Sequence, residues 1–201
     1  IIKQTGITHL YREDGTESAY SPQCILALGY EELKFDRTWP SSVRFIGPAL
    51  YTPSNLGFEP TFEVGRLHIL VTLGTHLSWH KEEVANAIFQ LSRTLPKIMF
   101  HFTDGDHEAE TYCNIGNFMR IPWVNYENYI SRYDLVIHHG GAGIMYYCLE
   151  NDIPALIYPV DFDQFDHAAR LDLSGRGIWL KGGVKAIINA KPKIEQILNK
   201  Q

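Results

Sequence analysis

Short apolar segments and amphipathic segments alternate regularly after residue 65, and this alternation constrains the fold more than any other feature. The apolar segments predict strands at 66–74, 97–102, 134–139, 154–159 and 177–180. The segments between them predict helices at 78–95, 126–133, 142–151 and 163–175, and a closing helix follows at 192–200. Strands joined by helices through short connections are typical of parallel βα units, so we predict an α/β fold with a doubly wound parallel sheet.

The first strand and helix of this series carry the clearest pattern. Residues 66–74 form a continuous apolar run, which is typical of a strand buried on both faces of a sheet. We expect Ser78 to cap the helix that follows. The apolar spacing in that helix predicts one buried face, made by Val84, Ile88, Leu91 and Leu95.

The first 65 residues follow a different pattern. Residues 1–23 are polar and expected to be loop, and two short apolar segments, 24–30 and 43–48, predict strands. The segment 51–65 is rich in residues that interrupt helices and strands, namely Pro53, Gly57, Pro60 and Gly65. We therefore expect a first part over 1–50, a linker over 51–65 and a larger domain over 66–201.

Composition excludes several classes of protein. The 201 residues carry a formal net charge of −5, which disfavours a nucleic-acid-binding surface. No apolar run is long enough to span a bilayer. The three cysteines, Cys24, Cys113 and Cys148, are far apart and form no CxxC pair, so we expect reduced thiols in a cytoplasmic protein.

The stretch HHGGAG, residues 138–143, lies where a predicted strand meets a predicted helix. Glycines let a ligand approach the main chain, and a helix N-terminus offers free N–H groups with partial positive charge. Together these features favour a phosphate site, to which the imidazole of His139 could donate. The same glycines are equally compatible with a tight turn alone, and the motif is neither GxGxxG nor a P-loop.

Two further segments follow predicted strands, at the edge of the sheet where ligands bind. Asp163 and Gln164 open a helix, and a carboxylate beside a carboxamide suits the vicinal hydroxyls of a sugar. Asp163 taken alone is more typical of a helix cap. Trp123, in PWVNY, could stack on a base, and a Trp in the core is the alternative.

Taken together, these segments resemble the donor-binding half of the UDP-glycosyltransferases with the GT-B fold, and are most similar to bacterial natural-product and lipid glycosyltransferases. His139, Pro154, Asp163 and Gln164 keep the order and spacing of that family. LVTLGT (70–75), SVRFIGP (42–48) and PWVNY (122–126) resemble its first donor-domain strand, its approach to the linker and its base-binding element. The resemblance covers about residues 42 to 190. It implies a Rossmann-like donor domain over 66–201, preceded by the end of an acceptor domain over 1–50.

The resemblance also implies a role for each matching residue. Gly74 and Thr75 would approach the phosphates, Trp123 and Val124 would hold the base, and His139 would stabilise the diphosphate as leaving group. Asp163 and Gln164 would hold the sugar hydroxyls. The complete donor-binding set is Gly74, Thr75, Trp123, Val124, His139, Gly140, Gly141, Ala142, Gly143, Asp163 and Gln164. The resemblance implies neither a cofactor nor a metal, since the helix end and His139 do the work of a metal.

Three positions depart from the family pattern. Ile144 replaces a hydroxyl residue after the glycines, Tyr147 replaces a ribose-binding Glu, and Asp152 replaces a Gly. From these departures we expect weaker or altered nucleotide binding. No residue resembles the family's catalytic His, which lies in its N-terminal half, and His9 is expected to be an ordinary loop residue. The chain alone is therefore expected to bind donor without transferring sugar.

The function that the resemblance implies is inverting transfer of a sugar from a UDP- or dTDP-sugar to a lipid or small molecule. The partners would be the nucleotide sugar, the missing N-terminal acceptor domain and a lipid or peripheral membrane acceptor, with no nucleic acid. Two alternatives remain: a non-catalytic or split-subunit nucleotide-sugar-binding module, and a hydrolysing nucleotide-sugar epimerase of the same fold. A zinc site at His76 and His80 is disfavoured because no third ligand is near, and 104–110 is expected to be a solvated acidic loop.

Overall fold

The computed structural model of this chain describes residues 9–36, 38–51, 58–109 and 112–199. Parts of four predicted segments therefore lie outside the described residues: 1–8 of the N-terminal loop, 52–57 of the linker with Pro53 and Gly57, residue 110, and 200–201. The chain divides into two compact units, Ile1–Ala49 and Leu50–Gln201.

The first unit is small and holds one pair of strands. β1 (Ile25–Ala27) pairs in parallel with β2 (Val43–Phe45), and the 3-10 helix η1 (Glu31–Leu33) lies between them in sequence. Both strands fall inside the segments predicted for them. His9 is an exposed residue of a segment with no regular structure, as expected.

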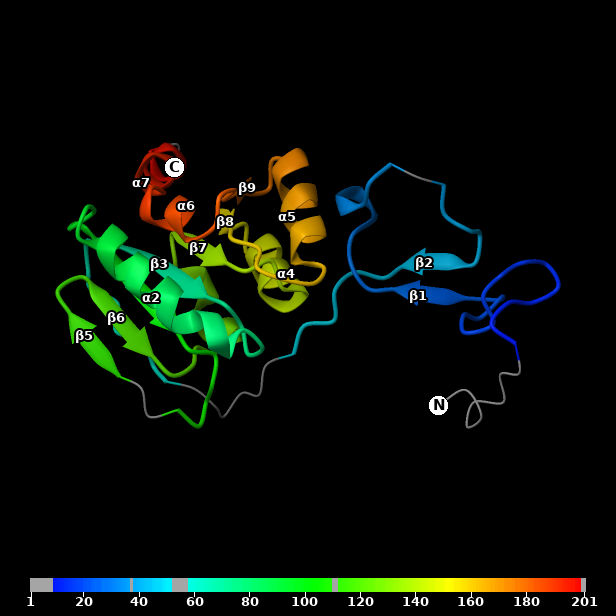
Figure 1. The fold of residues 1–201 in the computed structure, drawn as a ribbon, viewed down its shortest axis with the longest axis horizontal. Coiled ribbons are helices and arrows are strands. Elements are labelled where there is room, and N and C mark those ends of the chain that lie inside the picture. Colours follow the sequence, from blue (N-terminus) through cyan, green and yellow to red (C-terminus); the bar gives the residue numbers. More distant parts are fainter. Residues whose placement is uncertain (1–8, 37, 52–57, 110–111, 200–201) are drawn as a thin grey trace. The chain divides into compact units, whose positions relative to one another are not determined.

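The second unit is built on a seven-stranded sheet with the order β5-β6-β4-β3-β7-β8-β9 (Figure 1). Every neighbouring pair of strands is parallel except β5 with β6. The strands are β3 (Leu67–Thr72), β4 (Ile98–Thr103), β5 (Cys113–Ile115), β6 (Phe118–Ile121), β7 (Leu135–His138), β8 (Ala155–Ile157) and β9 (Ile178–Trp179). The predicted α/β fold with a mainly parallel sheet is confirmed.

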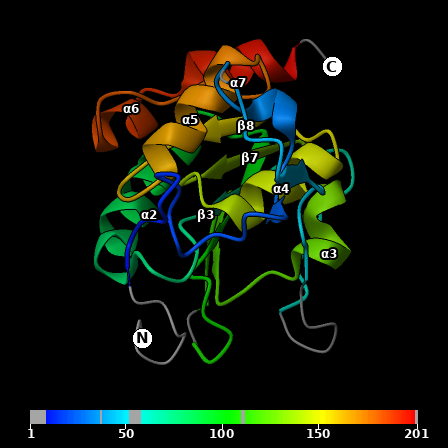
Figure 2. The ribbon, with the colours of Figure 1, turned by 90° about the vertical axis from the view of Figure 1, so that its right-hand side faces the viewer.

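Helices connect these strands. They are α2 (Ser78–Ser92), α3 (Tyr126–Tyr129), the 3-10 helix η2 (Ile130–Arg132), α4 (Ala142–Glu150), α5 (Gln164–Leu173), α6 (Val184–Ile188) and α7 (Lys191–Leu198). Figures 1 and 2 show α4 and α5 side by side, and α6 and α7 together near the end of the chain. None of the helices in the described part of the chain is long and apolar enough to cross a bilayer.

The strand order reverses beside β3. The chain adds β4 and β6 on one side of β3, then returns to add β7, β8 and β9 on the other. The loops that follow β3 and β7 therefore start next to each other at the same edge of the sheet and run in opposite directions. Ligands bind α/β sheets at such a switch point. HHGGAG is the loop after β7, at this point.

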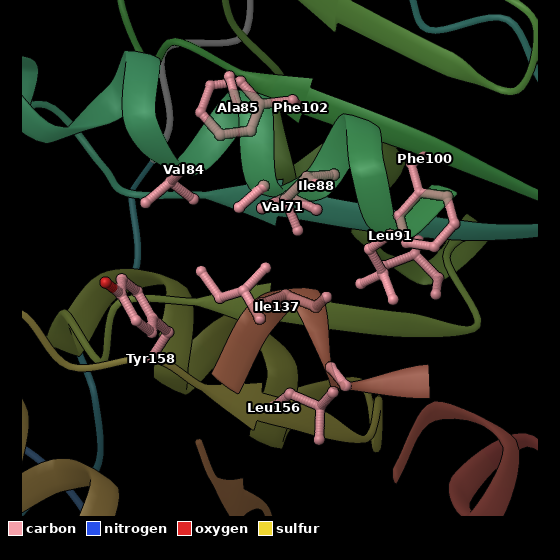
Figure 3. Close-up of a cluster of buried hydrophobic side chains, with 14 of the residues drawn as sticks. Val71, Val84, Ala85, Ile88, Leu91, Phe100, Phe102, Ile137, Leu156 and Tyr158 are labelled. Carbon is pink, nitrogen blue, oxygen red and sulfur yellow. The ribbon is translucent and has the colours of Figure 1, made fainter. Parts of the chain in front are cut away.

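The core has two layers, one on each face of the sheet. On the first face, Val84, Ile88 and Leu91 of α2 pack against sheet residues such as Val71 and Ile137 (Figure 3). On the other face, residues of η2 and α4 pack against Leu70 and Val136. The prediction that 66–74 is buried on both faces is confirmed.

Three local predictions were incomplete or wrong. Strands β5 and β6 were not predicted, and neither was α6. Ser78 is the first residue of α2 instead of its cap: the N-cap residue is Leu77, which makes no side-chain hydrogen bond. The predicted buried face of this helix, including Leu95 just beyond its end, is confirmed.

Candidate functional site

His139 lies between two glycines from different loops. A Cβ atom added to Gly74 would lie 2.8 Å from Cε1 of His139, and one added to Gly141 would lie 2.4 Å from Nε2. Both distances are shorter than real Cβ contacts, so any side chain at either glycine would displace the ring. The glycines therefore fix where the imidazole sits, in the space between the loops after β3 and β7.

Gly140 joins the glycine loop to α5. Its φ is 91°, in the left-handed region that favours glycine, and an added Cβ would lie 3.0 Å from the carbonyl oxygen of Gln164. The carbonyl oxygen of Gly140 accepts a hydrogen bond of 2.7 Å from Nδ1 of His167. These contacts place the first turn of α5, which follows Asp163, directly against the loop that contains His139.

His138 holds the glycine loop through a hydrogen bond to its main chain. The N–H of Gly140 donates to Nδ1 of His138 at 3.0 Å, so Nδ1 carries no proton in this arrangement. The side chain is fully buried, and its Nε2 has no partner among the described residues. Burial lowers the pKa of His138 to about 3. His138 is therefore a positioning residue that sequence reasoning missed, although the HH doublet was visible.

The first turn of α4 faces the same place. Gly141 is the N-cap residue and Ala142 begins the helix, so the N–H groups of Ala142, Gly143 and Ile144 have no partner within the helix. An added Cβ at Gly143 would meet nothing within 4 Å. Gly143 is thus not needed for packing, and its missing side chain leaves open space above three N–H donors.

His139 is neutral in the free protein. Burial lowers its pKa to about 4, a hydrogen bond to the main chain of Thr72 and the Asp163 carboxylate oppose the shift, and nearby His76 and Lys81 add to it. The ring is therefore unprotonated at pH 7. A diphosphate beside it would favour the protonated form, because a nearby negative charge raises the pKa of an imidazole.

The loop after β3 is held by a chain of hydrogen bonds through the hydroxyl groups of Thr72 and Tyr126. The N–H of Gly74 donates to the Thr72 hydroxyl at 3.1 Å, and that hydroxyl lies 2.9 Å from the Tyr126 hydroxyl. Burial raises the pKa of Tyr126 to about 12. Thr75 is exposed at the tip, with its hydroxyl 3.2 Å from Nδ1 of His76. Tyr126 and Thr72 thus position Gly74, which sequence reasoning did not find.

The loop after β4 is anchored by charged side chains. The Arg120 guanidinium donates to both carboxylate oxygens of Asp104, with distances of 3.0 to 3.2 Å, and pairs with Glu82 at 2.7 Å. Lys81 donates to the main-chain oxygen of Asp104. Asp104 is buried, so the expected solvated loop at 104–110 was wrong at its first residue. Arg120 lies on β6, a strand that was not predicted, so the sequence did not reveal its ion pair with Asp104.

The pair Asp163 and Gln164 divides into two roles. Oε1 of Gln164 accepts from the N–H groups of Val160 and Asp161 at 2.9 and 3.0 Å, so this oxygen shapes the loop before α5. Asp163 is the N-cap residue of α5, yet its side chain makes no capping hydrogen bond. Its carboxylate is exposed, 4.0 Å from Nε2 of His167. A capping role for Asp163 is therefore not seen.

Trp123 and Val124 follow β6, three strand positions from β7 and so about 14 Å along the sheet edge. The Val124 side chain is fully buried, which leaves only its main chain for a ligand. The Trp123 ring is half-buried, and its carbonyl oxygen accepts from the N–H of Phe58 at 3.3 Å. Phe58, a residue of the predicted linker, therefore pairs with the segment expected to hold a base.

The three departures from the family pattern have structural explanations. Ile144 and Tyr147 are both buried in the core beneath α4, and the Tyr147 ring lies edge-on to Tyr126. Ile144 still offers its main-chain N–H at the helix end, so the loss of a side-chain hydroxyl does not remove every donor there. Asp152 has a φ of 51°, a left-handed conformation that glycine adopts without strain.

The structure also gives the positions of the histidines and cysteines that were weighed as metal ligands or redox groups. Among the residues that the structure describes, no three His, Cys, Asp or Glu gather as a metal site. His80 is bonded to Tyr158 and Glu83, away from the exposed His76. Cys24, Cys113 and Cys148 are all free.

A cavity of about 570 Å³ lies at the opposite edge of the sheet, lined by residues such as Pro154 and Gly177 that precede β8 and β9. It has no part in the cluster around His139. The carboxyl edge is the better candidate site because it brings together free main-chain donors, an imidazole and a carboxylate.

Residues 68–186 match the family model of the glycosyltransferase family 28 C-terminal domain. The chain belongs to this family. No curated protein sequence matches the chain.

Solved structures show the same architecture. The glycotransferase of kitacinnamycin aligns with a TM-score of 0.68 and 19% identity, over 94% of this chain and 54% of that one. The spinosyn rhamnosyltransferase SpnG gives a TM-score of 0.65 and 23% identity, over 90% and 49%. The spinosyn forosaminyltransferase SpnP gives 0.65 and 14%, over 87% and 46%. These structural similarities show a shared GT-B-type fold and no more, and the chain spans about half the length of each structure.

Proposed function

We propose that this chain is the donor-binding half of a glycosyltransferase that moves a sugar from a nucleoside diphosphate sugar to an acceptor. The observation that carries the proposal is the open space above the first turn of α4. Three free N–H groups, a fixed imidazole and a gap at Gly143 meet there. Such a set suits the oxygens of a diphosphate, since helix N-termini bind anions and hydrogen bonds to charged oxygens are strong.

Thymidine or uridine diphosphate is the proposed carrier. The structures of SpnG, of SsfS6 from Streptomyces sp. SF2575 and of VinC were determined with thymidine diphosphate, which supports thymidine first. The diphosphate would lie against His139 and the N–H groups of α4, and the nucleoside would follow the sheet edge toward Trp123. The donor sugar would lie beside the exposed carboxylate of Asp163.

The chemistry is an in-line displacement with inversion. An acceptor hydroxyl forms the new bond to the anomeric carbon, while the bond to the diphosphate oxygen breaks and its electrons leave with the diphosphate. The N–H donors and His139 stabilise that leaving charge, which is the electrostatic part of catalysis. We assign no residue of this chain as the base that takes the hydroxyl proton. The acceptor is proposed to be a small hydrophobic molecule or lipid, which the SpnG complex with spinosyn aglycone supports.

Calorimetric titration with dTDP, UDP, GDP and ADP tests the proposal. We expect one pyrimidine diphosphate to bind, and His139→Ala to weaken that binding at least tenfold, about 1.4 kcal/mol. His9→Ala, in the first unit, is the control and should bind as the parent does. Failure of every diphosphate to bind at millimolar concentration, or equal binding by His139→Ala, would refute the donor site. Two further assays, transfer and hydrolysis, separate the glycosyltransferase from a binding module and from a hydrolysing epimerase. They are made with an acceptor domain present, because the chain alone is expected to bind donor without transferring sugar.

A further inference from the structure

The loop between β8 and α5 presents one aromatic side chain in an unusual way. Phe162 has a φ of 54°, in the left-handed region that costs a non-glycine residue about 1–2 kcal/mol. Its side chain is 76% exposed, so no core packing is gained in return. Strained residues of this kind persist only where their surroundings hold them, and they concentrate at functional sites.

Three hydrogen bonds hold the backbone around Phe162. Its own N–H donates to the Asp161 carboxylate at 2.8 Å, and Oε1 of the buried Gln164 accepts from the two preceding N–H groups. Gln164 is in turn fixed by contact with Gly140 in the glycine loop. The conformation of Phe162 is therefore set by the same packing that builds the candidate diphosphate site.

The neighbours of Phe162 define what it could contact. Asp163 follows directly, with an exposed carboxylate that acts on the His139 ring. Both residues thus lie at the carboxyl edge of the sheet, beside the first turn of α4. An exposed aromatic ring next to a carboxylate suits a hexose, which carries hydroxyl groups at its rim and an apolar face of C–H groups.

We infer that Phe162 is a specificity-determining residue whose ring packs on the C–H face of the donor sugar while Asp163 accepts from its hydroxyls. The inference rests on the proposed function and adds a residue to its sugar subsite. It accounts for the strain: glycine would fit the backbone better, and contact between the ring and a ligand would offset the cost of the left-handed conformation.

The test compares a nucleotide with and without its sugar. Dissociation constants of dTDP and dTDP-glucose are measured by calorimetry for the parent chain, Phe162→Gly and Phe162→Tyr. We expect Phe162→Gly to bind dTDP as the parent does and to lose roughly tenfold in affinity for dTDP-glucose, because the removed contact involves the sugar alone. Phe162→Tyr keeps a ring and should retain most of the affinity.

Thermal unfolding provides the second measurement. Because glycine relieves the left-handed strain, Phe162→Gly should unfold at the same temperature as the parent or up to about 3 °C higher. Asp152→Gly is the matched control, because it relieves a similar φ of 51° at the end of α4. Although Asp152 departs from the family pattern, it pairs with Arg176 and lines the cavity at the opposite edge of the sheet, so Asp152→Gly should leave both affinities unchanged.

The outcomes are distinct. Unchanged dTDP-glucose affinity in Phe162→Gly overturns the inference, and so does an equal loss for dTDP and dTDP-glucose, which would mean that Phe162 shapes the nucleotide site. A fall in unfolding temperature would show that Phe162 stabilises the fold, and this also overturns the inference. If dTDP fails to bind the parent chain, the proposed function falls and the inference falls with it.

Discussion

Replacing Gly143 and Gly141 with alanine, one at a time, distinguishes a glycine needed for ligand binding from a glycine needed for packing as well. At Gly143 an added Cβ meets nothing within 4 Å, and the φ is not left-handed. Alanine is a better helix former than glycine by about 0.8–1.0 kcal/mol, so Gly143→Ala should stabilise the domain by roughly 0.5–1 kcal/mol near the helix end. This corresponds to a rise of about 1–4 °C in unfolding temperature for a chain of this size.

The same methyl group should weaken diphosphate binding, because it would occupy the space assigned to phosphate oxygens. Losing one N–H bond to a charged oxygen costs about 1.5–3 kcal/mol, which predicts a loss of roughly 10- to 100-fold in dTDP affinity. Gly141→Ala should lose affinity too, but with the opposite effect on stability. Its Cβ would lie 2.4 Å from Nε2 of His139, and such overpacking costs about 1–3 kcal/mol.

Calorimetric affinity for dTDP and thermal unfolding are measured on both variants and the parent. We expect two losses of affinity with stability changes of opposite sign. If Gly143→Ala stabilises the chain and still binds dTDP as the parent does, the space above α4 is not the phosphate site. If Gly143→Ala destabilises the chain, the structural assignment of that space as empty is wrong.

Four further predictions concern the groups around the site. Asp104→Asn should destabilise the domain by about 1.5–3 kcal/mol in urea unfolding, because the half-buried Arg120 loses its hydrogen bonds to the buried Asp104 carboxylate and keeps only its pair with Glu82; a change below 1 kcal/mol would contradict this. Tyr126→Phe should cost about 1 kcal/mol and weaken dTDP binding only a few-fold, since the Thr72 hydroxyl still accepts from Gly74. Folding stability should fall as pH drops from about 6.5 to 4. Burial holds the pKa of His101 and His139 near 4 and that of His138 near 3 in the folded protein. In this pH range the unfolded chain therefore binds protons that the folded chain does not, and unfolding is favoured. The pKa shifts of His101 and His139 correspond to about 3 kcal/mol each and that of His138 to about 5 kcal/mol. Urea midpoints that stay constant between pH 7 and pH 5 would refute the prediction. Affinity for dTDP should rise as pH falls from 8 to 6, because a bound diphosphate favours protonated His139, and His139→Ala should remove that slope.

The sequence predicted the central strands and the longer helices because their burial is recorded in local patterns. Residues 66–74 are mostly apolar, and β3 is buried on both faces from His68 onward. The helix 78–95 shows its apolar spacing directly. Strands β5 and β6 were missed because Asn117 and Arg120 make the segment look polar. Their burial depends on partners elsewhere: Asn117 donates to the carbonyl oxygens of Ser92, Leu95 and Ile98.

The candidate site shows the same division. The glycines, His139 and Asp163 could be found from motif and spacing, since ligand-facing loops keep their signals close together in sequence. The groups that position them could not. His138, Tyr126 and His167 act through contacts between segments up to 54 residues apart, as in the hydroxyl pair of Tyr126 and Thr72. No local pattern distinguishes such a residue from one that only fills the core.

The electrostatic design of the site follows from these positions. The donors that face the open space are main-chain N–H groups and an imidazole that is neutral at pH 7. Lys81, whose positive charge acts on His139, is itself buried, and its ammonium group donates to the carbonyl oxygen of Asp104. Before the ligand arrives, the site therefore holds no protonated imidazole in a poorly solvated place, which would be costly. The positive charge on His139 would appear only together with the diphosphate, as a proton taken up on binding. Selectivity for a doubly charged ligand then arises because binding of the diphosphate is coupled to proton uptake by His139. A neutral sugar alone would not cause this proton uptake.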